Sequence, residues 1–289
     1  MVKKKSVFLG NCHNLGIITY LNKSEEFREL YSVEYYTNWE LLKYKINPPV
    51  ESIKNCDLFI FQPLSAVYGC YSTYPDVPDS IGSFVKDDCI KISYPYTYFS
   101  AFWPIVQSEQ NKNRWLGWRP IHKLKTENLS DKDILDRYNK NSIDWEYEKR
   151  FEETISILKE KEKYTDISIS NFIVDRIKSE RLFLIPQHPT SIIFLEIANQ
   201  ILKKLNMSEL SVSSIISENE SNMLDSTYNR VDCKFPVHKS VIDFYQVNFT
   251  KEDSDSHDFY LNKIMDYLKM NHGNKTPEET ITRDWEYKI

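Results

Sequence analysis

The feature of this sequence that most limits its fold is the apolar run at residues 57–61, where four apolar side chains follow Asp57 without alternation. A strand of this kind is expected between two layers of helices in a parallel sheet. Four similar runs occupy residues 6–10, 32–36, 89–93 and 181–186, and helical spacing of apolar residues separates them, as at 15–21 and 39–45. Because alternating strands and helices form parallel βαβ units, we expect a three-layer αβα fold of the α/β class with a mainly parallel central sheet.

The middle of the chain differs in composition from the rest. Residues 107–166 are rich in Lys, Glu, Asp and Asn, and apolar residues recur at helical spacing over residues 130–163. We interpret this stretch as a helical insertion or lid on a single α/β domain that spans residues 1–289. A further helix is expected at 191–205, and the polar tail at 271–289 is expected to be loosely ordered.

Composition excludes several classes of protein. With 289 residues, 41% of them hydrophobic, the chain can bury a core without disulfides or metals. The net charge of −5 argues against a nucleic-acid-binding protein, which would present a basic face. No apolar stretch is long enough for a signal peptide or a membrane span, so we expect a cytoplasmic protein.

The cysteines and histidines show no ligand pattern. The five cysteines are irregularly spaced and fit neither a disulfide framework nor a CxxC zinc site. The six histidines lack a metal-ligand spacing such as HxxxH. We therefore expect no metal.

Reactive side chains follow three of the expected strands. Cys12 follows the first strand, Gln62 the third, and His188 the fifth. Ligands of open parallel sheets bind beyond the carboxyl ends of the strands, so parallel neighbours would bring these groups to one edge. Each residue also has a purely structural interpretation. Cys12 could be a small buried side chain, Gln62 could tie a loop to the backbone, and His188 could bridge a turn.

Together these residues fit nucleophilic acyl transfer. A thiol at the N-terminus of the helix that follows Cys12 is expected to have a lowered pKa. Gly10 allows a close approach of a ligand to the backbone, and the Asn11 and Gln62 amides are suitable donors to an oxyanion. His188 is the natural general base. His13 has three open interpretations, namely the base itself, a substrate-binding residue or an exposed side chain.

Two further groups lie near the same edge. The aromatic segment at residues 94–104, which includes Trp103, could form an apolar wall for a sugar or an acyl-carrier arm. Arg119 and Lys123 form a modest basic group able to meet phosphates.

At these residues the sequence resembles the WcbI-type capsular polysaccharide biosynthesis proteins, regarded as acetyltransferases that use acetyl-coenzyme A. Five short motifs carry the resemblance in order: Gly10-Asn11-Cys12-His13, Phe61-Gln62, Phe102-Trp103-Pro104, Gln187-His188-Pro189-Thr190 and Phe235-Pro236-Val237-His238. The family usually has Gln at the position of His13 and Asn at that of Gln187.

The resemblance implies a coenzyme A-dependent O-acetyltransferase that acts on a sugar hydroxyl in the synthesis of a capsular or other surface glycan. It also extends distantly to the Ser–His (SGNH-type) hydrolases, with Cys in place of Ser. Because Ile185 stands where those hydrolases place an Asp, we expect a Cys12–His188 dyad. A Cys-dependent esterase or deacetylase and a non-catalytic glycan- or nucleotide-binding protein are the alternatives.

Overall fold

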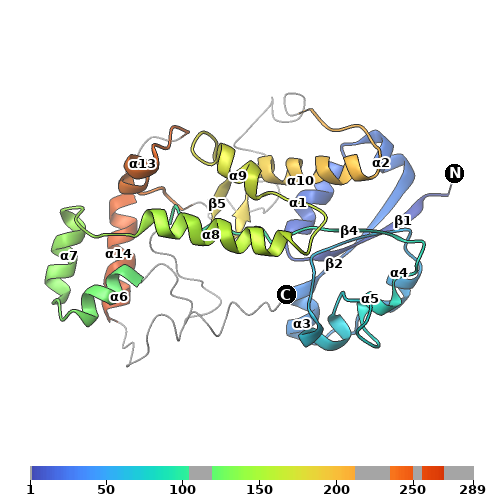
Figure 1. Ribbon diagram of the computed structural model, residues 1–289, viewed down its shortest axis with the longest axis horizontal. Coiled ribbons are helices and arrows are strands. Elements are labelled where there is room, and N and C mark those ends of the chain that lie inside the picture. The colour runs from blue at the N-terminus through green and yellow to red at the C-terminus, as the bar shows by residue number, and fades with distance from the viewer. Residues whose placement is uncertain (1, 104–118, 212–234, 250–255, 270–289) are drawn as a thin grey trace.

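The computed structural model describes residues 2–103, 119–211, 235–249 and 256–269, and it has an α/β architecture (Figure 1). Its four-stranded sheet has the order β2-β1-β3-β4, and all three strand pairs are parallel. The strands are β1 (Lys4–Gly10), β2 (Tyr31–Thr37), β3 (Leu58–Phe61) and β4 (Ile90–Ser93). The predicted parallel sheet and its first four strands are confirmed.

Both faces of the sheet are covered, which gives the predicted three layers. On one face, Val7, Leu9 and Phe59 form an apolar cluster with residues of α3, α4 and α5. On the other face, Phe8 and Ile60 belong to a larger core that includes residues of α1, α8, α9 and α10. Consecutive residues of β1 therefore point into different layers, so both faces of the strand must be apolar.

The helices among residues 2–84 are α1 (His13–Leu21), α2 (Glu25–Leu30), α3 (Asn38–Tyr44), α4 (Val50–Lys54), the 3-10 helix η1 (Ala66–Tyr71) and α5 (Ile81–Phe84), and α9 (Ser170–Arg176) and α10 (Ser191–Lys204) follow later in the chain. The remaining helices are α6 (Arg119–Thr126), α7 (Asp131–Asn139), α8 (Tyr147–Glu162), α13 (Lys239–Tyr245) and α14 (Ser256–Lys269), and α7 packs against α14 beyond the end of the sheet (Figure 1).

The helical pattern at residues 130–163 corresponds to helices that are interrupted between residues 139 and 147. The chain forms two helices there, α7 and α8, because Asn141 and Glu146 both adopt positive φ values, of 51° and 52°. Between them Ile143 and Trp145 turn into the core, with 8% and 3% of their surfaces exposed. The burial of these two apolar side chains stabilises the segment in which the helical hydrogen bonds are interrupted. The start of the predicted insertion, residues 107–118, and the tail at 271–289 lie outside the described residues.

The predicted fifth parallel strand is wrong. Residues Phe183–Ile185 form β5, which pairs antiparallel with the two-residue strand β6 (His188–Pro189) in a separate sheet. Only Pro186 and Gln187 connect the two strands, and a connection this short can join only antiparallel partners. None of the helices in the described ranges is long and apolar enough to cross a membrane.

Candidate active site

The strand order reverses between β1 and β3, and ligands of such sheets bind in the crevice at this point. At the carboxyl ends of these two strands, the backbone N–H of Asn11 donates a hydrogen bond of 2.8 Å to Gln62 Oε1. Because a backbone N–H only donates, this contact fixes the orientation of the Gln62 amide. The Nε2 group of Gln62 is buried and has no hydrogen-bond partner among the described residues. Gln62 thus has a donor left for a ligand oxygen, whereas the N–H of Asn11 is already in use.

Gly10 makes room for a polar cluster beside this crevice. A Cβ atom on Gly10 would lie 2.2 Å from the Tyr94 hydroxyl oxygen and 2.8 Å from Asn14 Oδ1. The Tyr94 hydroxyl donates to Asn14 Oδ1, and Asn14 Nδ2 donates to the carbonyl oxygen of Tyr36, at 3.1 Å. These contacts join the ends of β2 and β4 to the first turn of α1, so the glycine is required by space and not by its backbone angles.

Cys12 is the N-cap residue of α1 and is half-buried. Burial raises the pKa of its thiol to about 11, and a backbone hydrogen bond, which lowers the pKa, only partly offsets this. The predicted lowering of this pKa is therefore wrong, because loss of hydration outweighs the helix N-terminus. At neutral pH about one molecule in 10⁴ would carry the thiolate. Cys12 needs a base if it is to act as a nucleophile.

His13 is fully buried and therefore does not have the exposed side chain considered above. Its Nε2 lies 2.9 Å from the carbonyl oxygen of Gln187, which can only accept, so Nε2 carries the proton. Its ring stacks on Tyr96, with centroids 5.4 Å apart, and packs edge-on against Phe194. Burial, with smaller contributions from the nearby His188 and Lys161, lowers the pKa of His13 to about 4, and the hydrogen bond to Gln187 offsets this only in part. The imidazole is therefore neutral at physiological pH.

His188 lies in the same region despite the error in strand topology. It is half-buried on β6, next to the Gln187 carbonyl that His13 binds, and near enough to His13 to affect its charge. Cys12 in turn contributes to the raised pKa of Tyr94. The structure thus brings the Gln187–His188 turn to the start of α1, while Gln62 lies beside Asn11.

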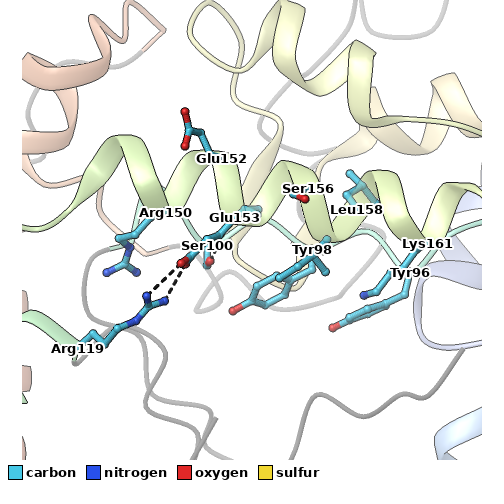
Figure 2. A pocket seen from close by; sticks show the side chains of 12 residues that line it. Tyr96, Tyr98, Ser100, Arg119, Arg150, Glu152, Glu153, Ser156, Leu158 and Lys161 are labelled. Atoms are coloured by element: carbon cyan, nitrogen blue, oxygen red, sulfur yellow. Dashed lines mark hydrogen bonds and ion pairs between the residues drawn. The ribbon is translucent and has the colours of Figure 1, made fainter. Parts of the chain in front are cut away.

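A cavity of about 550 Å³ runs along one side of α8 (Figure 2). It is lined by Tyr96, Tyr98, Ser100, Arg119, Arg150, Glu152, Glu153, Thr154, Ser156, Ile157, Leu158 and Lys161. Tyr96 belongs both to this lining and to the stack on His13, so one side chain separates the cavity from the buried His13 ring. Figure 2 shows Arg119 and Arg150 at one end and Tyr96 with Lys161 at the other.

The end of the cavity near α6 carries paired charges. Both guanidinium nitrogens of Arg119 bind the carboxylate of Glu153, at 3.1 and 2.7 Å, and this contact lowers the pKa of the carboxyl group. Arg150 is buried and donates a hydrogen bond of 3.0 Å to the carbonyl oxygen of Trp103. Two guanidinium groups therefore line the cavity at this end. Glu153 pairs with Arg119, and the carboxylate of Glu152 also belongs to the lining.

Lys161 forms the opposite end of the cavity. Its Nζ lies 4.9 Å from the centroid of the Tyr96 ring, and burial lowers its pKa to about 8. The sequence analysis missed Lys161, because it lies in the charged stretch interpreted there as a helical insertion or lid, in which charged side chains are expected to face the solvent. Its neighbour Lys159 is exposed, as that interpretation expects.

Most of the predicted site residues do not line the cavity, and Cys12, Gln62 and His188 are among those that do not. Trp103 is 1% exposed and packs beside Phe102 in the core, so its ring is not accessible to a sugar. Lys123 is exposed on α6. Of the predicted phosphate-binding pair, only Arg119 lines the cavity. Within the described ranges, no group of three or more His, Cys, Asp or Glu side chains is arranged to hold a metal ion.

Comparison with known proteins identifies the family of this chain. The model of the WcbI family, described as a polysaccharide biosynthesis enzyme, matches residues 5–210. The chain belongs to the WcbI family. A solved structure of WcbI, described as a polysaccharide biosynthesis enzyme, covers 97% of this chain and 93% of its own, with a TM-score of 0.67 and 17% identity. That structure is described as native protein without a disulfide bond between coenzyme A and one of its cysteines. No curated protein sequence matches the chain.

Proposed function

We propose that this member of the WcbI family is an O-acetyltransferase that moves an acetyl group from acetyl-coenzyme A to a sugar hydroxyl of a surface polysaccharide. The observation that carries the proposal is the cavity along α8, which extends from the two arginines to Tyr96, whose ring stacks on His13 beside the predicted site. Family membership, and the coenzyme A named for the solved WcbI structure, support the choice of donor.

The dimensions of the cavity suit an extended donor. Arg150 and Lys161 lie eleven residues apart on α8, which corresponds to about 16 Å along the helix axis. Tyr96, Tyr98 and Leu158 provide apolar surface between them. In this arrangement the phosphates of the donor would meet Arg119 and Arg150, and its acyl-carrier arm would lie over the tyrosines. The thioester would then reach Lys161 and the crevice.

The chemistry follows from the groups at the crevice. His188 removes the proton from the acceptor hydroxyl, and the oxygen attacks the thioester carbonyl to form a tetrahedral oxyanion. The unpaired Nε2–H of Gln62 is a suitable donor to this oxyanion, and the ammonium group of Lys161 would add positive charge. Collapse breaks the C–S bond, and the coenzyme A sulfur leaves with the proton held by His188. The products are an acetyl ester and free coenzyme A.

The raised pKa of Cys12 bears on its role. Direct attack by the sugar oxygen requires no thiolate, so Cys12 would then contribute only to the shape of the crevice. Covalent transfer requires His188 to take the thiol proton as the sulfur attacks, after which the sugar oxygen cleaves the new thioester. Intact-protein mass spectrometry under turnover separates the routes, because only the covalent route gives a protein species with an added acetyl group.

Release of coenzyme A from acetyl-coenzyme A tests the proposed reaction against the hydrolytic alternative. The assay compares water with a hydrolysate of acidic and neutral surface glycans as acceptor. A transferase should release coenzyme A faster with acceptor and form acetyl esters, and the His188→Ala variant should lose this difference. Release at the same rate in water would instead identify a hydrolase. Full turnover by a Cys12→Ala, His188→Ala double variant would exclude the proposed site.

A further inference from the structure

The position of His188 is not set by the main sheet. In the part of the chain that the structure describes, β5 and β6 form a sheet of their own, separate from the four parallel strands, of which β1 leads to Cys12 and β3 to Gln62. β6 contains only His188 and Pro189, so the ladder between β5 and β6 cannot define its distance from the crevice. Other contacts hold the hairpin: the backbone N–H of Phe99 donates to the Pro186 carbonyl oxygen over 2.9 Å, and α10, which begins at Ser191, packs against α1. A direct contact between the turn and the start of α1 would fix the place of His188 there.

His13 makes such a contact. It is the first residue of α1, and its Nε2–H donates to the carbonyl oxygen of Gln187, the residue before His188, over 2.9 Å. Its own backbone N–H donates to Asn11 Oδ1, at 3.0 Å, which fixes the residue relative to the end of β1. One side chain therefore connects the two halves of the candidate site, which are 174 residues apart in the chain.

The surroundings of His13 hold its ring in one orientation. Tyr96 stacks on it with an interplanar angle of 13°, and Phe194 of α10 packs at its edge with an angle of 64°. The side chain is fully buried, and its Nδ1 has no hydrogen-bond partner among the described residues. The bond to Gln187 is the ring's one hydrogen bond among the described residues, so its loss would leave the Gln187 carbonyl without its imidazole donor.

We propose that His13 is a positioning residue, whose Nε2–H bond to the Gln187 carbonyl sets the place of His188 relative to Cys12 and Gln62. The inference rests on the proposed function for its catalytic consequence, but the positioning itself does not depend on that function. His13 acts through the turn and does not itself touch the substrate. Its burial also keeps the ring neutral, with a pKa of about 4, so that Nδ1 stays unprotonated and the ring donates through Nε2 alone.

Two substitutions separate the hydrogen bond from the packing. His13→Gln keeps an N–H donor of similar reach but removes the aromatic ring, whereas His13→Phe keeps a stacking ring but removes the donor. The first readout is the imidazole signal and pKa of His188, measured by NMR on histidine-labelled protein. The second is the rate of coenzyme A release from acetyl-coenzyme A, resolved into kcat and KM.

If the hydrogen bond positions His188, the Gln variant keeps the His188 signal and pKa near those of the wild type, and the Phe variant shifts both. In the rate assay the Phe variant should lose on the order of tenfold to a hundredfold in kcat with little change in KM, and the Gln variant should recover most of that loss. The reverse order, equal shifts in both variants, or no shift in either would overturn the proposal. If the wild type shows no turnover, the proposed function fails, while the NMR result still decides the role of His13.

Discussion

The tightest packing around the candidate site is at Gly10, where a single methyl group should disturb the polar cluster. In Gly10→Ala the new Cβ would lie 2.2 Å from the Tyr94 hydroxyl, 2.8 Å from Asn14 Oδ1 and 3.2 Å from Gln62 Oε1. Gly10 does not have a positive φ, so alanine fits the backbone and the effect comes from space alone. Overpacking of this kind costs about 1–3 kcal/mol in the free energy of unfolding.

The Tyr94→Phe change tests whether this overlap is the cause. Alone it removes the hydrogen bond to Asn14 and leaves a buried oxygen unsatisfied, at a cost of about 1–3 kcal/mol. In the double variant the atom nearest to the new methyl group is absent, and Asn14 is freer to move. We therefore expect the double variant to be less destabilised than the sum of the single variants, by about 1–2 kcal/mol.

Urea unfolding followed by circular dichroism gives the four free energies of this cycle. The control cycle pairs Tyr94→Phe with Gly82→Ala, in which the added Cβ would meet the backbone of Thr73 at 2.4 Å and shares none of the contacts around Gly10. The control cycle should be additive. If the Gly10 cycle is also additive within error, the overlap with the Tyr94 hydroxyl is not the reason for the glycine.

Two further predictions follow from buried titratable groups. Burial lowers the pKa of His13 and that of His238 each to about 4, so the unfolded chain binds more protons than the folded one below about pH 6.5. The free energy of unfolding should therefore fall as the pH decreases from about 7 to 4, by up to about 3 kcal/mol for each histidine. Urea midpoints that stay constant across this pH range would show that these histidines do not have lowered pKa values in the folded protein. At neutral pH, iodoacetamide should alkylate half-buried Cys12 more slowly than exposed Cys70, as measured by peptide mass spectrometry. Because burial raises the pKa of the Cys12 thiol to about 11, its alkylation rate should keep rising up to about that pH. Faster labelling of Cys12 than of Cys70 at neutral pH would show an activated thiol.

The local pattern of the sequence was enough to predict the parallel sheet. The runs that became β1 and β3 are apolar on both faces, and only strands between two helical layers have that pattern. The pattern was not enough at residues 181–189, where an apolar run resembles a buried parallel strand but the short connection to His188 makes a hairpin. It also failed at residues 140–146, where Asn141 and Glu146 adopt positive φ values within a stretch of helical composition.

The candidate site was likewise predicted only in part from the sequence. The meeting of Asn11 and Gln62 follows from strand ends in a parallel sheet, and the sequence analysis predicted it. Lys161 and Tyr96 reach the site through the packing of α8 and of the segment after β4, and no periodicity in the sequence reports such contacts between distant segments. The pKa of Cys12 was predicted in the wrong direction. The prediction considered the favourable effect of the helix N-terminus on the thiolate, but the burial of the thiol, which raises its pKa, is not visible in the sequence.

Calorimetric titration with coenzyme A and acetyl-coenzyme A tests the central claim, that the cavity along α8 holds an acyl donor. The variants are Arg119→Gln and Lys161→Gln, which alter the two ends of the cavity, with Lys159→Gln as a matched control on an exposed part of the same helix. We expect saturable binding to the wild type, about tenfold weaker binding by each cavity variant, and unchanged binding by the control. Absence of binding to the wild type, or equal weakening by Lys159→Gln, would contradict the account.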